Sequence, residues 1–119
     1  MPSADKHQNQ HLHNMKLLDS ETFSMSDEFS DWFVTILFYG ALHLIEREIA
    51  KAQYRIDNHT ERLKWVSRTV PLNRIKDDFN VLYFQSRRAR YDCARFKPKD
   101  IEGLKKHYSN IEKLLNPAS

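Results

Sequence analysis

Three side chains have the chemistry needed to cleave RNA without a metal ion. His43 stands three residues before Glu46, and His59 stands three residues before Arg62. A histidine transfers protons near neutral pH, and a neighbouring carboxylate or guanidinium tunes its pKa. An arginine stabilises negative charge that develops on a phosphate oxygen. His43, His59 and Arg62 are therefore candidate catalytic residues. The alternative is structural, with His43 in a buried polar network, His59 capping a helix and Arg62 facing water.

A second group of residues has the chemistry to hold a phosphate and a base. Arg87 and Arg90 are three residues apart on one helical face and can point at one phosphate, while Tyr91 can stack on a base. Tyr39 shares a helical face with His43, four residues later. These four residues form the candidate nucleic-acid or nucleotide-binding set. Tyrosine and arginine are also enriched in protein interfaces, so a protein-interaction surface is the alternative.

The charge of the chain is divided unevenly between its two halves. Residues 1–50 hold eight acidic and three basic residues, a net charge of −5, and residues 51–119 hold sixteen basic and eight acidic residues, a net charge of +8. The densest basic patch comprises Arg87, Arg88, Arg90, Arg95, Lys97 and Lys99. Such a patch can neutralise phosphates, or it can be an exposed helix end whose carbonyl groups favour cations.

Helices must position these side chains, because the apolar residues recur at helical spacing. The pattern predicts a long helix over about 27–53, a short one over 60–69, and two more over about 72–89 and 98–115. Pro71 and Pro98 mark helix starts. Gly40 lies on the apolar stripe of the long helix, where a missing side chain lets another helix approach closely. We predict an all-α protein, an antiparallel up-and-down bundle of four to five helices.

Length and composition indicate a single domain. Of the 119 residues, 1–24 resemble a flexible lead-in with little to bury, and 25–119 form the predicted domain. One cysteine excludes an intrachain disulfide and a multi-cysteine zinc site, and two glycines argue against a glycine-rich phosphate loop. We expect no cofactor and no bound metal. The sequence contains neither a membrane-spanning run nor a signal peptide, so we expect a cytoplasmic protein without membrane contact.

Three sequence blocks together resemble the HEPN superfamily, and in particular its small uncharacterised members. The blocks are FYGALHLIEREIA at 38–50, HTER at 59–62 and SRRARYD at 86–92. The resemblance covers about 31–115. It implies a helical bundle that often forms a homodimer, and a function as a metal-independent RNase, a toxin, a partner of a nucleotidyltransferase or an RNA-binding module.

The sequence departs from the catalytic pattern of that family at one point. RNase members carry an arginine followed by four to six residues and then a histidine, whereas here three residues separate Arg55 from His59. The leading prediction is therefore binding of RNA or a nucleotide through the basic and aromatic residues, without strong catalysis. Two alternatives remain, a metal-independent endoribonuclease and a purely structural interaction module.

Overall fold

The structure is a computed structural model that describes residues 3–18, 29–92 and 94–117. Five α-helices and one short 3-10 helix make up this part of the chain, namely α1 (Ala4–Leu18), α3 (Ser30–Lys51), α4 (His59–Arg68), η2 (Leu72–Ile75), α5 (Lys76–Tyr91) and α6 (Pro98–Leu115). No strand occurs among the described residues. The all-α prediction is thereby confirmed, and none of the helices is long and apolar enough to span a bilayer.

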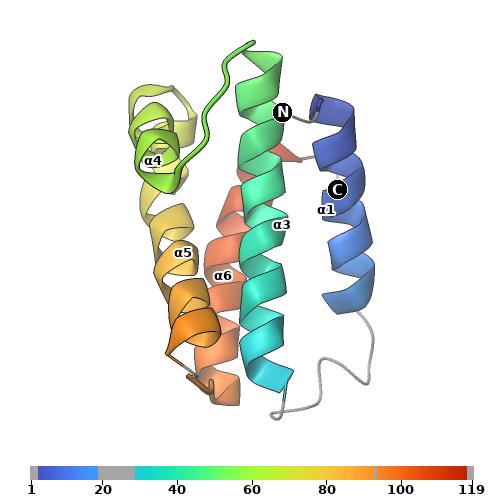
Figure 1. Ribbon diagram of the computed structural model, residues 1–119, viewed down its shortest axis with the longest axis vertical. Coiled ribbons are helices and arrows are strands. Elements are labelled where there is room, and N and C mark those ends of the chain that lie inside the picture. Colours follow the sequence, from blue (N-terminus) through green and yellow to red (C-terminus); the bar gives the residue numbers. More distant parts are fainter. Residues whose placement is uncertain (1–2, 19–28, 93, 118–119) are drawn as a thin grey trace.

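The long helices alternate in direction, as Figure 1 shows. α1 runs down the bundle, α3 runs up beside it, α5 runs down and α6 returns up, while the short α4 lies beside the upper part of α5. The bundle is elongated, with extents of 39 × 25 × 23 Å. The predicted antiparallel up-and-down arrangement is confirmed.

The core is centred on α3, which contacts α1 on one side and α5 and α6 on the other. Five apolar side chains of α3 are fully buried, Val34, Ala41, Leu44, Ile45 and Ile49. The other helices add further fully buried residues, Val66, Phe79, Leu82 and Ile111. Burial of these side chains removes apolar surface from water and holds the four long helices together.

Hydrogen bonds near Asn58 and Asp100 stabilise the first turns of α4 and α6, the helices that carry part of the candidate sites. Asn58 precedes α4 and accepts a hydrogen bond from the backbone N–H of Glu61 at 2.9 Å. Pro98 occupies the first turn of α6, as predicted, and the carboxylate of Asp100 accepts from the backbone N–H of Lys97 at 3.1 Å. The chain therefore enters both helices in a fixed orientation.

The first helix is a correction to the sequence prediction of a lead-in with little to bury. Residues 4–18 form α1, which packs along α3 and buries His7 and His11. His11 contacts the carbonyl oxygen of Gly40 at 3.2 Å. The helix that approaches α3 closely at Gly40 is therefore α1. Residues 1–2 and 19–24 of the predicted lead-in lie outside the described residues.

Gly103 offers a stability prediction. It lies within α6, and a Cβ atom added there would meet nothing within 4 Å. Gly103→Ala is expected to raise the free energy of unfolding by roughly 0.5–1 kcal/mol, because alanine loses less backbone entropy in a helix than glycine. Urea unfolding followed by circular dichroism measures the change. An unchanged or lowered stability would contradict the prediction.

Candidate functional site

Aromatic and basic side chains alternate along the exposed side of α5. The guanidinium carbon of Arg87 lies 5.0 Å from the ring centroid of Tyr91 and 5.8 Å from that of Tyr83. Tyr91 is 65% exposed and Phe84 is also exposed. We call Tyr83, Phe84, Arg87 and Tyr91 the α5 face. It presents cation–π pairs and free ring surface to solvent.

Arg90 belongs to the same helix but points toward α3. Its Nη1 donates to the hydroxyl of Tyr39 at 3.1 Å, and its Nε donates to the carbonyl of Ser86 at 3.2 Å. The Nη2 group lies 3.3 Å from the Ser86 hydroxyl, and Arg90 is half-buried. The structure thus brings two predicted binding residues, Tyr39 and Arg90, into direct contact. One of the three hydrogen bonds of Arg90 joins α5 to α3, and the other two stay within α5.

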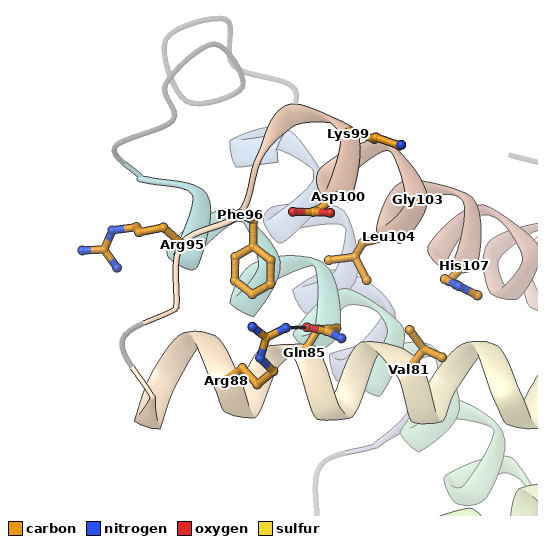
Figure 2. A pocket seen from close by; sticks show the side chains of 10 residues that line it. All are labelled: Val81, Gln85, Arg88, Arg95, Phe96, Lys99, Asp100, Gly103, Leu104 and His107. Carbon is orange, nitrogen blue, oxygen red and sulfur yellow. Dashed lines mark hydrogen bonds between the residues drawn. The ribbon is translucent and has the colours of Figure 1, made fainter.

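A pocket lies between α5 and the N-terminal part of α6, and the α5 residues that line it are Val81, Gln85 and Arg88. Its volume is about 340 Å³, and we call it the α5–α6 pocket. Figure 2 shows Phe96 pointing between the two helices, opposite Arg88, with Arg95 and Lys99 extending outward at the rim. The backbone N–H of Phe96 donates to the buried hydroxyl of Ser30 at 3.0 Å. This hydrogen bond holds the connector between α5 and α6, residues 94–97, against the start of α3.

The α5–α6 pocket carries a positive charge. Arg88, Arg95 and Lys99 line it, and Asp100 is the acidic residue among its lining side chains. The Asp100 carboxylate already accepts the hydrogen bond of the α6 start described above. Arg88 donates to Gln85 at 2.8 Å, and its guanidinium carbon lies 5.8 Å from the Phe96 ring centroid. The arrangement suits an anion that has a flat apolar neighbour.

His43 and Arg62, two of the predicted catalytic residues, line a different cavity, which we call the α3–α4 cavity. Its volume is about 280 Å³, and it is lined by residues of α1, α3, α4 and the α3–α4 loop, namely His7, Leu42, His43, Glu46, Ile56, Asp57 and Arg62. The Arg62 Nε donates to a carboxylate oxygen of the buried Glu46. The guanidinium of Arg62 therefore has a fixed counter-charge on α3.

A histidine pair forms one wall of this cavity. The Nδ1 atoms of His7 and His43 are 2.7 Å apart, so one ring donates a hydrogen bond to the other. Burial lowers the pKa of His43 to about 4, with the neighbouring His7 and His11 acting in the same direction. Burial also lowers the pKa of His7, although the nearby Glu46 opposes that shift. Both rings are therefore neutral at pH 7.

His59 lies apart from His43, in a third pocket that Tyr83 and Phe84 also line. Its ring stacks on Tyr83 with centroids 3.4 Å apart and planes 2° from parallel, and its Nε2 lies 3.2 Å from the side-chain oxygen of Asn80. Burial lowers the pKa of His59, while the Asn80 contact raises it. The structure places His59 against α5 and Arg62 against α3, so the two do not meet at one cavity.

No family model, no curated protein and no solved structure matches this chain. The part of the HEPN resemblance that the structure confirms is the all-helical bundle. The candidate residues of the three HEPN-like blocks are distributed over the α5 face, the α5–α6 pocket, the contact between Arg90 and Tyr39, the α3–α4 cavity and the separate pocket that contains His59.

Sequence reasoning missed several residues of these sites. Phe96 carries no motif, and its position over Arg88 depends on how the connector packs. His7 lies in the predicted lead-in, yet it contacts His43. Glu46 is named in the sequence analysis as a carboxylate near His43, and what the sequence does not indicate is its partner in the buried ion pair. That partner is Arg62.

Proposed function

We propose that this protein binds RNA or a nucleotide at the C-terminal end of α5, with a phosphate in the α5–α6 pocket and a base against the α5 face. The observation that carries the proposal is that one pocket of about 340 Å³ is lined by three cationic residues, Arg88, Arg95 and Lys99. Counting Asp100 and the carboxylate of Asp31, which pairs with Arg95 at 3.3 Å, the pocket keeps an excess of one positive charge. Positive charge attracts phosphate, and arginine binds it with geometric specificity.

The α5 face supplies the second half of the proposed recognition. The ring of Tyr91 is exposed and carries Arg87 at 5.0 Å, which resembles the way proteins hold unpaired bases between aromatic and guanidinium planes. Arg87 is exposed, whereas most donors of Arg90 are used within the fold. We therefore assign ligand contact to Arg87 and Tyr91, and positioning to Arg90 and Tyr39.

The binding proposal predicts a salt-dependent affinity that depends on Arg88. The affinity is measured by fluorescence anisotropy, in which the protein is titrated into a labelled single-stranded RNA at several salt concentrations. Arg88→Ala is expected to weaken binding about tenfold and to reduce the slope of log K against log salt by about 0.7, the value for one lost phosphate contact on a single strand. Lys51→Ala is the control, because α3 ends at the end of the bundle opposite the start of α6.

A second pair of variants separates charge from shape. Gly103 lines the α5–α6 pocket, and a side chain added there has open space around it. Gly103→Glu is expected to weaken RNA binding several-fold, whereas Gly103→Gln, with nearly the same shape, is expected to weaken it much less. Equal affinities for the two variants, or an affinity that is independent of salt, would contradict the proposal.

Two features of the α3–α4 cavity favour binding over RNA cleavage. A histidine with a pKa of about 4 is a weak general base and is unprotonated as a general acid at pH 7. The Nε of Arg62 is already paired with Glu46. Labelled RNA incubated with the protein in EDTA is therefore expected to stay intact. Cleavage that is lost in His43→Ala would favour the endoribonuclease alternative instead.

A further inference from the structure

A large pocket between α4 and α5 continues the α5 face toward the start of α5. Its volume is about 590 Å³, its lining residues include His59, Tyr83 and Phe84, and we call it the α4–α5 pocket. Phe84, Arg87 and Tyr91 follow one another at three- and four-residue spacing, so they lie on one side of the helix. The α4–α5 pocket shares no lining residue with the α5–α6 pocket. It is therefore a separate place at which a ligand on the α5 face can be held.

Aromatic rings form one wall of the α4–α5 pocket. The His59 ring stacks on Tyr83 with nearly parallel planes, and Phe84 meets Tyr83 edge-on with ring centroids 5.6 Å apart. Phe84 is 56% exposed, so much of its side chain is accessible to a ligand. Every nucleobase has a flat face that can stack on an aromatic side chain. The wall therefore suits a base or another flat ring.

The charges at the α4–α5 pocket cancel. Lys64 is paired with Glu61 at 3.5 Å. Lys76 and Asp77, which are neighbours in sequence, both line the pocket and have opposite charges. Burial lowers the pKa of His59, so its ring is mostly neutral at pH 7. A pocket without excess positive charge suits an uncharged base better than a phosphate.

Polar groups of the same pocket can bind the edge of a base. The side-chain oxygen of Asn80 lies 3.2 Å from Nε2 of His59, and the NH2 group of Asn80 has no hydrogen-bond partner among the described residues. The exposed Thr60 also lines the pocket and brings a hydroxyl group. Amide and hydroxyl groups form hydrogen bonds with the edges of unpaired bases. The pocket thus combines a stacking wall with groups that can hold a base in one orientation.

Arg87 lies between the α4–α5 pocket and Tyr91. It is exposed, and its Nη1 donates one hydrogen bond of 3.4 Å to the Tyr83 hydroxyl, which leaves most of its five donors for a ligand. The axis of α5 rises about 10 Å from Phe84 to Tyr91, which is longer than one base. A ligand that reaches both rings therefore needs two bases, and the phosphate that joins them would lie near Arg87.

From these observations we infer that the α4–α5 pocket holds a second unpaired base, so that the ligand is a single strand of RNA along α5 and not a mononucleotide. One base lies against Tyr91, the next lies on Phe84, and the phosphate between them contacts Arg87. The inference rests on the proposed function, because the α5–α6 pocket and Tyr91 hold the first phosphate and the first base.

A competition experiment compares ligands with one base and with several. Fluorescence anisotropy follows the displacement of a labelled four-nucleotide RNA composed of adenine and cytosine, which do not pair with each other. The competitors are adenosine 5′-monophosphate and the unlabelled, 5′-phosphorylated four-nucleotide strand. The mononucleotide is expected to bind at least about tenfold more weakly than the strand, because a single base occupies only one of the two aromatic sites.

Substitutions of Phe84 separate the flat ring from apolar surface. Phe84→Leu keeps an apolar side chain and removes the ring, and it is expected to weaken binding of the four-nucleotide strand about fivefold. Phe84→Tyr keeps a ring that can stack and is expected to bind as the wild type does. Tyr54→Leu is the control, because Tyr54 is 60% exposed and lines neither of the two pockets on α5 nor the α3–α4 cavity. The melting temperature of the Phe84 variants is expected to stay the same, because the side chain is exposed.

The outcomes distinguish a failure of the inference from a failure of the proposed function. The strand may bind and lose affinity in Arg88→Ala, while Phe84→Leu binds it as tightly as the wild type or the mononucleotide binds as tightly as the strand. In that case the proposed function stands and the inference is overturned. If no strand binds at millimolar concentration, or if Arg88→Ala has no effect on affinity, both are overturned.

Discussion

Arg62→Met is expected to lower the free energy of unfolding by about 3–5 kcal/mol, the usual cost of removing one partner from a buried ion pair. The side chain of Glu46 is 5% exposed and that of Arg62 is 18% exposed, so both charges are largely shielded from bulk water. Methionine preserves much of the length and apolar contact of the arginine stem, so the change isolates the charge. Urea unfolding at pH 7, followed by circular dichroism, measures the loss.

A double variant and an exposed pair serve as controls for this prediction. Glu46→Gln combined with Arg62→Met removes both charges and is expected to recover a large part of the lost stability, because no uncompensated charge remains buried. Lys64→Met breaks the Lys64–Glu61 pair, in which both side chains are 55% exposed, and is expected to cost less than about 1 kcal/mol. A loss of that small size in Arg62→Met would show that Glu46 reaches water.

The sequence predicts well those helices whose buried residues are apolar and recur at helical spacing. The long central helix, the short α4 and the helix that begins at Pro98 all follow from apolar residues at three- and four-residue spacing. α1 could not be predicted in the same way, because its buried side chains include histidines. The burial of His11 depends on the Gly40 carbonyl, on Tyr108 and on Glu112, which are distant in sequence.

The sequence indicates which types of residue the candidate sites contain. It does not indicate which of those residues come into contact. The contact between Arg90 and Tyr39 joins residues that are 51 positions apart, and only the packing of α5 on α3 creates it. His59 and Arg62 share one side of α4 by their spacing, yet one contacts Tyr83 on α5 and the other contacts Glu46 on α3. Helical spacing indicates which residues share a face. It does not indicate which of two neighbouring helices each side chain contacts.

Acidification from pH 7 to pH 4 is expected to remove about 2–3 kcal/mol of stability through His43 alone. The pKa of His43 is about 4 in the folded protein against an ordinary value of 6.5, so the unfolded chain binds more protons throughout this range. Stability therefore rises with pH from about 4 to 6.5 and is lost as the pH falls through that range. The lowered pKa values of His7 and His11 act in the same direction, because burial outweighs the nearby carboxylates Glu46 and Glu112.

The contribution of His43 is isolated by comparing the wild type with His43→Gln across pH 4–7. The variant is expected to be less stable than the wild type at pH 7, because His7 loses its hydrogen-bond partner. Its stability should then fall less steeply with acid, by about 2–3 kcal/mol over the range, since glutamine does not titrate. Carboxylates titrate in both proteins and cancel in the difference. Parallel pH profiles would mean that His43 is solvated in the folded state, and the buried contact between α1 and α3 would then not be the source of the acid sensitivity.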